Sequence, residues 1–139
     1  MASCCMAEPW TAVPEWIAKA EGDWEALEIL STRNTPGLRD SVVFHAQQCV
    51  EKLLKARLIQ LGQMVDKTHD LAALSRQLEV VDDQWNWDVE DLADLSSGAV
   101  LARYPGFETS AEEQADLVEL ASRLRQALRM LLGSEQQGK

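Results

Sequence analysis

The stretch FHAQQCVEKLLKA, Phe44 to Ala56, decides the fold. Apolar residues recur around it at steps of three and four, so that one broad side of a helix is apolar. The members of this apolar arc are Val42, Ala46, Cys49, Val50, Leu53 and Ala56. An arc of this width is typical of a helix with neighbours on more than one side. The pattern predicts a helix from Leu38 or Asp40 to Leu61.

The segments on either side also show helical periodicity, and none shows the alternation of a strand. We predict a first helix over residues 14–30 and a short third helix over residues 68–78, capped by Thr68. A fourth helix is expected after Asp88, and a fifth from the capping box Ser110–Glu113 to Gly133. The connections are short, which predicts antiparallel neighbours. The fold class is therefore all-α: a single-domain, up-and-down bundle of about five helices.

The length of 139 residues is that of one domain. We interpret residues 1–12 as a flexible leader, 13–133 as the bundle and 134–139 as a flexible tail. No run of 18 apolar residues occurs, so we predict no membrane span, and the leader lacks the features of a secretory signal. We therefore expect a cytoplasmic protein. The three cysteines have no zinc spacing, so no metal site and no cofactor is predicted.

The charge of the chain restricts its ligands. The net charge is -10, which repels phosphate backbones and argues against general nucleic-acid binding. Basic residues nevertheless gather near the two histidines of the chain, at Lys52, Lys55, Arg57 and Lys67. Such a local cationic patch can hold a compact anion such as a nucleotide. The alternative is an ordinary solvated helix face.

Three motifs in order carry a family resemblance: FHAQQCVEKLLKA, then KTHDL at residues 67–71, then ARYPG at residues 102–106. Together with the first-helix pattern, they resemble the HEPN (higher eukaryotes and prokaryotes nucleotide-binding) domain family over residues 14–132. The resemblance implies a bundle of about five helices and a homodimer. It implies one of three roles: a ribonuclease, often a toxin; a partner of a small nucleotidyltransferase; or a nucleotide-binding module.

Ribonuclease members of this family carry an Arg followed about four to six residues later by a His. Arg103 matches the Arg, but no His follows it in the sequence YPGFETS. A metal-independent ribonuclease needs a group with a near-neutral pKa, and Arg cannot act as a base. The pair Arg39–His45 has the right spacing but begins the second helix, so we interpret it as coincidence. We predict no catalytic residue and favour the nucleotidyltransferase partner. A ribonuclease toxin or a stand-alone nucleotide-binding protein are the alternatives.

The same region offers a candidate nucleotide site. The expected nucleotide-binding residues are His45, Gln48, Lys52, Arg103 and Tyr104. The alternative for His45 is a boundary position, bonded to a backbone carbonyl or to a dimer mate. The alternative for Arg103 is an ion pair with Glu108 or Glu112.

His69 is expected to have a local structural role in the first turn of the third helix. If the second and third helices are antiparallel, each begins at an opposite end, which puts His45 and His69 about 30 Å apart. We therefore expect no shared site for the two histidines within one chain.

Large apolar side chains suggest which surfaces are covered. Phe44, Leu58 and Ile59 lie off the apolar arc of the second helix, and together they predict an exposed patch that a homodimer would bury. The first-helix tryptophans, Trp16 and Trp24, are expected in the core. Trp85 and Trp87 are expected to cover the end of the bundle, with stacking on a base as the alternative.

Overall fold

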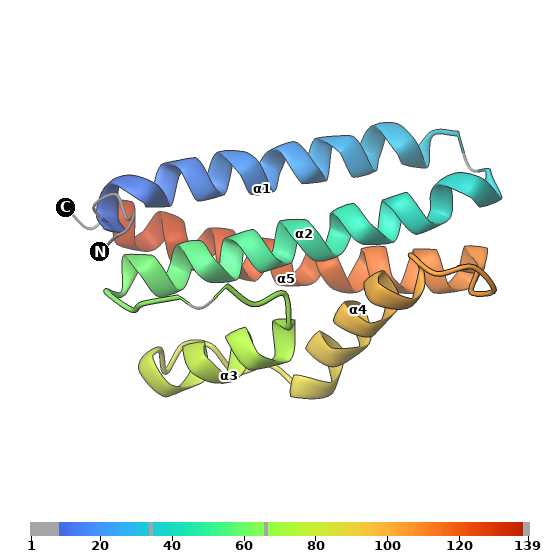
Figure 1. Ribbon diagram of the computed structural model, residues 1–139. Helices are drawn as coiled ribbons and strands as arrows, with labels where there is room; N and C mark the ends of the chain where they lie inside the picture. The colour runs from blue at the N-terminus through green and yellow to red at the C-terminus, as the bar shows by residue number, and fades with distance from the viewer. Residues whose placement is uncertain (1–8, 34, 66, 138–139) are drawn as a thin grey trace.

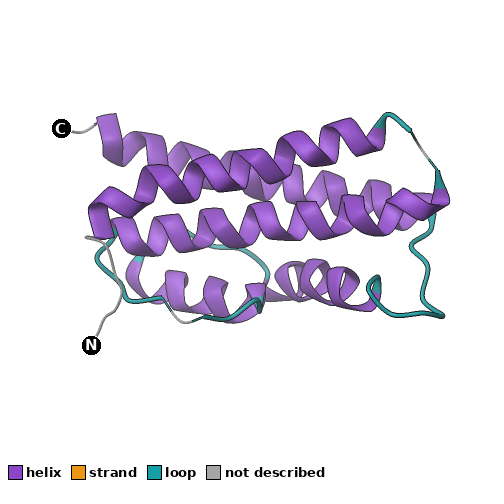
Figure 2. Ribbon diagram, turned by 45° about the horizontal axis from the view of Figure 1, so that its top comes forward, coloured by secondary structure: helices purple, strands orange, loops and turns teal. Residues whose placement is uncertain are grey.

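The computed structural model describes residues 9–33, 35–65 and 67–137, without the side chains of 9–11 and 134–137. Its elements are α1 (Pro9–Ser31), α2 (Pro36–Gln60), α3 (Leu71–Val81), α4 (Val89–Leu101) and α5 (Ala111–Gln137). This part of the chain consists of helices and loops, without a strand (Figure 2). The predicted all-α, single-domain bundle of five helices is confirmed. None of the helices in these ranges carries an apolar stretch long enough for a bilayer.

The three long helices lie side by side, and α2 is central (Figure 1). α1 and α2 are antiparallel, joined by the turn that follows Ser31. α5 runs parallel to α2. At the start of both helices the Thr109 hydroxyl donates to Asp40, and at their end the Gln60 amide donates to the Leu132 carbonyl. α3 and α4 pack against the remaining side of α2 (Figure 1).

The direction of α3 differs from the prediction. His69, just before α3, contacts Glu51 in the middle of α2, and Asp82, just after α3, binds Arg57 further along α2. α3 therefore runs parallel to α2, and the expectation of an antiparallel pair is wrong. The reason is the connection between the two helices, which at the described residues 61–65 and 67–70 returns along α2 before α3 begins (Figure 1). Ten extended residues can span about 30 Å, twice the rise of the ten helical residues beside them.

The start of α3 is also set by a different cap. The carboxylate of Asp70 accepts hydrogen bonds from the backbone N–H groups of Ala72 and Ala73. The predicted cap, Thr68, instead accepts from the backbone N–H of Asp70. α3 thus begins at Leu71, after His69 rather than around it, and it extends past the predicted end to Val81. His69 is consequently a loop residue.

The predicted caps of the last two helices are confirmed. Asp88 accepts from the backbone N–H of Glu90 at the start of α4. Ser110 and Glu113 form a reciprocal capping box at the start of α5, each side chain accepting from the backbone N–H of the other, at 3.0 and 2.9 Å. Both signals act within one helical turn, which is why the sequence shows them.

The ends of the bundle extend beyond the predicted limits. α1 begins at Pro9 and contains Pro14, which was expected to open it. α5 continues past Gly133 to Gln137. Residues 1–8, including the adjacent Cys4 and Cys5, and residues 138–139 lie outside the described residues. The flexibility of the leader and of the tail stays a prediction.

The core confirms the apolar arc of α2, whose six predicted members are all buried. The other side of α2 differs from expectation. Glu51 and Lys55, which lie outside the predicted apolar arc, are only 3% and 6% exposed: His69 of the loop before α3 contacts Glu51, and Trp16 of α1 lies over Lys55. Leu58 is also fully buried, so the predicted exposed patch of Phe44, Leu58 and Ile59 does not form.

Trp16 and Trp24 lie in or against the core, as predicted. Trp24 is buried, and Trp16 packs against the core. Trp85 is 3% exposed and its indole N–H donates to the Ser75 hydroxyl at 2.9 Å. Trp87 stacks on Trp85 with ring centroids 5.8 Å apart. Trp85 and Trp87 therefore belong to the packing of α3 and its following loop, and the buried Trp85 ring offers no face to a base.

Candidate functional site

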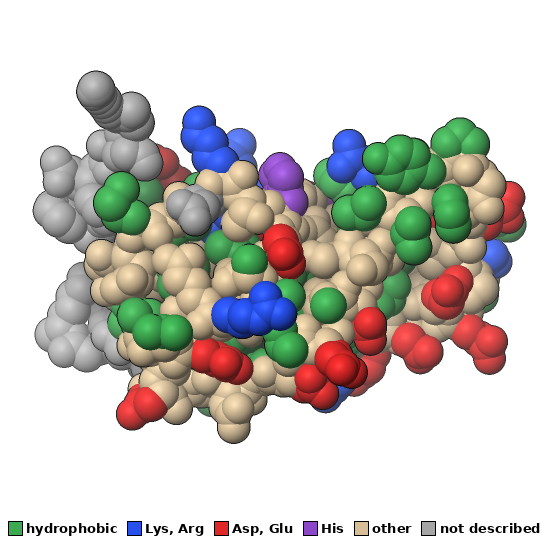
Figure 3. Space-filling model, turned by 60° about the horizontal axis from the view of Figure 1, so that its bottom comes forward, with side chains coloured by type: hydrophobic (Ala, Val, Ile, Leu, Met, Phe, Trp, Pro, Cys, Tyr) green, Lys and Arg blue, Asp and Glu red, His purple; other side chains and the backbone are tan. Residues whose placement is uncertain are grey.

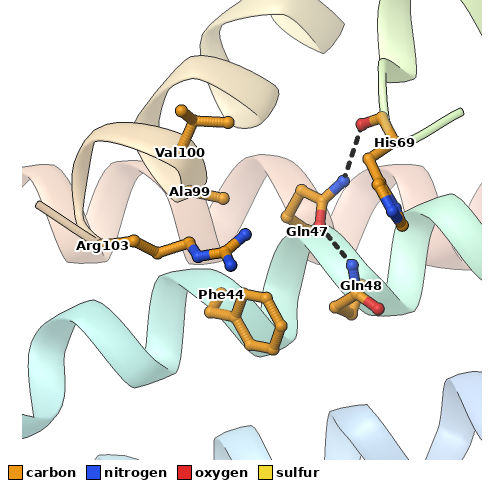
Figure 4. A pocket seen from close by; sticks show the side chains of 7 residues that line it. All are labelled: Phe44, Gln47, Gln48, His69, Ala99, Val100 and Arg103. Carbon is orange, nitrogen blue, oxygen red and sulfur yellow. Dashed lines mark hydrogen bonds between the residues drawn. The ribbon is translucent and has the colours of Figure 1, made fainter.

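A pocket of about 360 Å³ lies between the first half of α2, the loop before α3 and the end of α4 (Figure 4). Its lining residues are Phe44, Gln47, Gln48, His69, Ala99, Val100 and Arg103. The volume is at the lower end of the range found for small-molecule sites. Only the parallel course of α3 makes this pocket, because it brings the loop before α3 against α2 and α4.

Arg103 is the permanent charge of the pocket. It follows the last turn of α4, and its guanidinium lies 5.9 Å above the ring of Phe44. The alternative expectation, an ion pair with Glu108 or Glu112, is not met within the described residues. The guanidinium points into the pocket (Figure 4) and keeps its donors available for an anion.

His69 contributes an imidazole of defined orientation. Its Nδ1 lies 3.1 Å from both carboxylate oxygens of Glu51. A carboxylate can only accept, so Nδ1 carries the proton of this bond. The second nitrogen, Nε2, is left for a ligand, and 78% of the side chain is exposed. The same carboxylate–imidazole arrangement orients histidines in metal sites and in catalytic sites.

Glu51 is the buried anchor beneath the pocket. It accepts from the Lys55 ammonium at 2.9 Å and from the amides of Gln47 and Gln48 at 3.0 and 3.3 Å. Burial alone raises the pKa of the Glu51 carboxyl. The hydrogen bonds from Lys55, Gln47 and His69 outweigh burial, so the pKa is held below its ordinary value of 4.5. The carboxyl is therefore ionised at neutral pH.

The two glutamines differ in what they leave free. Gln47 uses all of its amide: the nitrogen donates to Glu51 and to the His69 carbonyl, and the oxygen accepts from Gln48 (Figure 4). The Gln48 nitrogen donates to Gln47 and Glu51, which fixes the orientation of this amide. Its oxygen has no partner among the described residues. Gln48 thus offers the pocket one acceptor.

His45 and Lys52, two of the predicted site residues, face away from this pocket. The His45 Nδ1 and the Lys52 ammonium both bind the carboxylate of Asp23 in α1, at 2.8 and 2.5 Å. Within the chain, His45 therefore bonds this carboxylate rather than a backbone carbonyl, and a contact with a dimer mate stays a prediction. The Asp23 cluster is a link between α1 and α2, and it uses the charge of Lys52.

The structure therefore brings together two of the predicted site residues, Gln48 and Arg103, and separates the others. Tyr104 is 58% exposed beyond the pocket lining. Sequence reasoning missed Phe44 and Gln47, and it gave His69 only a local role. The signal that could have found His69 is its motif neighbour Asp70, whose capping role places His69 before the helix rather than in it.

The expected distance between the histidines also needs correction. His69 contacts Glu51, which lies six residues after His45 in α2, a rise of about 9 Å. The estimate of about 30 Å failed because it assumed antiparallel helices. Each histidine nevertheless has its own carboxylate, Asp23 for His45 and Glu51 for His69. Only His69 lines the pocket.

Comparisons with known proteins bear on the fold. Residues 13–131 match the family model described as HEPN domain. The match extends from α1 into the last turns of α5 and includes every residue of the pocket. Comparisons with curated proteins and with solved structures found no match. Within the described residues, no group of three or more His, Cys, Asp or Glu side chains comes together as metal ligands.

Proposed function

Since the chain belongs to the HEPN domain family, we propose that it is a non-catalytic interaction module that binds a nucleotide in the pocket of α2 and α4. One observation carries the proposal: the guanidinium of Arg103, which no carboxylate of the described residues neutralises, faces the same pocket as His69 and Gln48. An unneutralised guanidinium in a pocket of a protein with net charge -10 can bind a small anion.

The lining divides into parts that suit the parts of a nucleotide. Arg103 can donate to phosphate oxygens, and so can the Nε2 of His69 when the imidazole carries both protons. Phe44, Ala99 and Val100 form an apolar wall for the base and the ribose. The free oxygen of Gln48 can accept from an amino group or a hydroxyl. A mostly apolar pocket with a few polar groups is the usual composition of a ligand site.

The proposal is tested by titrating AMP into the full chain by calorimetry. Arg103→Ala removes a charge-assisted contact and should weaken AMP binding by about tenfold or more. The control is Arg33→Ala, because Arg33 is exposed in the turn between α1 and α2 and lies outside the pocket. Equal affinity of the Arg103 and Arg33 variants would place the nucleotide elsewhere.

A ribonuclease is the second candidate, and His69 favours it. His69, oriented by Glu51, enters the pocket of Arg103 and supplies the imidazole that the sequence after Arg103 lacks. The net charge of -10 opposes RNA binding, and for this reason we place nucleotide binding first. Cleavage of single-stranded RNA that is lost in both His69→Ala and Arg103→Ala would reverse this order.

We also propose a homodimer, or a complex with a small nucleotidyltransferase, through the end of α4. Exposed apolar side chains gather there and in the following turn: Val100, Leu101, Tyr104 and Phe107, with 45–58% exposure. Figure 3 shows the face of the molecule that lies at the bottom of Figure 1, and hydrophobic side chains gather toward its right end. A monomer rarely leaves such side chains clustered. Light scattering that finds only a 15.5 kDa species would exclude the homodimer.

A further inference from the structure

We infer that the pocket recognises a single phosphoryl group, so that it takes nucleoside monophosphates and gives no added affinity to nucleoside triphosphates. The inference rests on the proposed nucleotide binding and specifies its ligand class. It follows from a comparison of the positively charged side chains near the pocket. Some of them are paired with carboxylates of the protein, and others can bind a ligand.

Two lysines of α2 near the pocket, Lys52 and Lys55, are not available to a ligand, and Lys67 lines neither the pocket nor the groove beside it. Lys55 is buried, with its ammonium bound to Glu51 and 5.6 Å from the centre of the Trp16 ring. Lys52 is bound to Asp23. Each of these lysines is neutralised by its carboxylate, so neither pair adds net charge to the pocket.

Two lining residues are left that carry or can acquire positive charge. Arg103 contributes one permanent charge. His69 contributes a second only in its protonated form, in which Nδ1 donates to Glu51 and Nε2 can donate to a ligand. The pocket therefore supplies between one and two positive charges. A phosphomonoester carries about -1.5 to -2 at neutral pH, which this supply matches.

Each further phosphoryl group adds negative charge that the lining does not neutralise. Beyond the pocket mouth, the neighbouring groove between α3 and α4 contains Asp70 and Arg76, which offset each other. The remaining field is that of a chain with net charge -10. β- and γ-phosphates would meet no net positive charge in this groove, because Asp70 lies in it beside Arg76, so their contacts should add no affinity.

Size leads to the same class of ligand. The pocket volume of about 360 Å³ is small for a ligand site. The base of a nucleotide would fill the part of the pocket that is lined by the apolar wall. Arg103 lies on one side of the pocket, and Gln48 and His69 lie on the other, so polar groups face a bound mononucleotide from both sides (Figure 4).

The experiment compares adenosine, AMP, ADP, ATP and inorganic phosphate by calorimetry with the full chain at pH 7, without divalent cations. AMP should bind about tenfold more tightly than adenosine, and ADP and ATP should bind no more tightly than AMP. His69→Gln, which keeps a donor to Glu51 but no charge, should weaken AMP severalfold and leave adenosine unchanged. Arg76→Ala, a matched loss of charge outside this pocket, should change neither.

The outcomes separate the two proposals. ATP binding tenfold more tightly than AMP would overturn the monophosphate inference while nucleotide binding stands. AMP that binds equally to wild type and to His69→Gln would overturn the charge count on which the inference rests. Phosphate that binds as tightly as AMP would show that the nucleoside is not recognised, and no binding of any compound would overturn both proposals.

Discussion

Glu51→Gln is the most informative single substitution, because it keeps the shape of a buried side chain and removes its charge. Glu51 accepts from Lys55, Gln47, Gln48 and His69, and it is 3% exposed. An amide in its place has one acceptor oxygen instead of two and brings an N–H donor toward groups that also donate. The Lys55 ammonium is then left buried without a counter-charge.

Removing one partner of a buried ion pair costs about 3–5 kcal/mol of unfolding free energy. We expect the lower value, about 3 kcal/mol, because Lys55 keeps its contact with the Trp16 ring. For a domain of 139 residues the entropy of unfolding is about 0.3 kcal/mol per kelvin. The melting temperature should therefore fall by about 10 °C.

The assay is urea and thermal unfolding followed by circular dichroism at pH 7. The double variant Glu51→Gln/Lys55→Met removes both charges and should recover most of the loss, because no uncompensated ion is left. The control is Glu25→Gln on the exposed face of α1, with an expected change below about 0.5 kcal/mol. Glu51→Gln within about 1 kcal/mol of wild type, or a double variant as unstable as the single one, would refute the buried pair as a determinant of stability.

Three smaller effects are also expected. Ser110→Ala breaks the capping box of α5 and should cost about 1 kcal/mol in urea unfolding, whereas no change would mean that the cap is redundant. Low pH should destabilise the fold in part by protonating Glu51. The pKa of Glu51 is lower in the folded chain than its ordinary value, so its contribution to the free energy of unfolding is complete above pH 4.5 and is lost as the pH falls through the folded pKa. Glu51→Gln should accordingly show a shallower acid loss than wild type. Cys49 is fully buried and burial raises its pKa to about 12, so peptide mapping after thiol alkylation at pH 8 should find it modified only in unfolded protein.

Much of the fold could be predicted from the sequence, because the relevant interactions are local. The apolar arc of α2 repeats within two turns, and the caps Asp88 and Ser110 act on backbone groups two or three residues away. These features appear in any short window of sequence. The candidate site could be predicted only in part: Arg103 and Gln48 were found by their residue types and by the family motifs.

By itself, then, the sequence determined the helices, their caps, the apolar side of α2 and the family to which the chain belongs. Only the tertiary structure decided the direction of α3, the burial of Glu51 and Lys55, and the presence of His69 in the pocket of Arg103. All three depend on contacts between residues far apart in the chain. The loop before α3 is long enough to allow α3 to run in either direction along α2. The packing of the apolar face of α3 against α2 and α4 selects one of the two directions. The spacing of residues within a helix does not encode this choice.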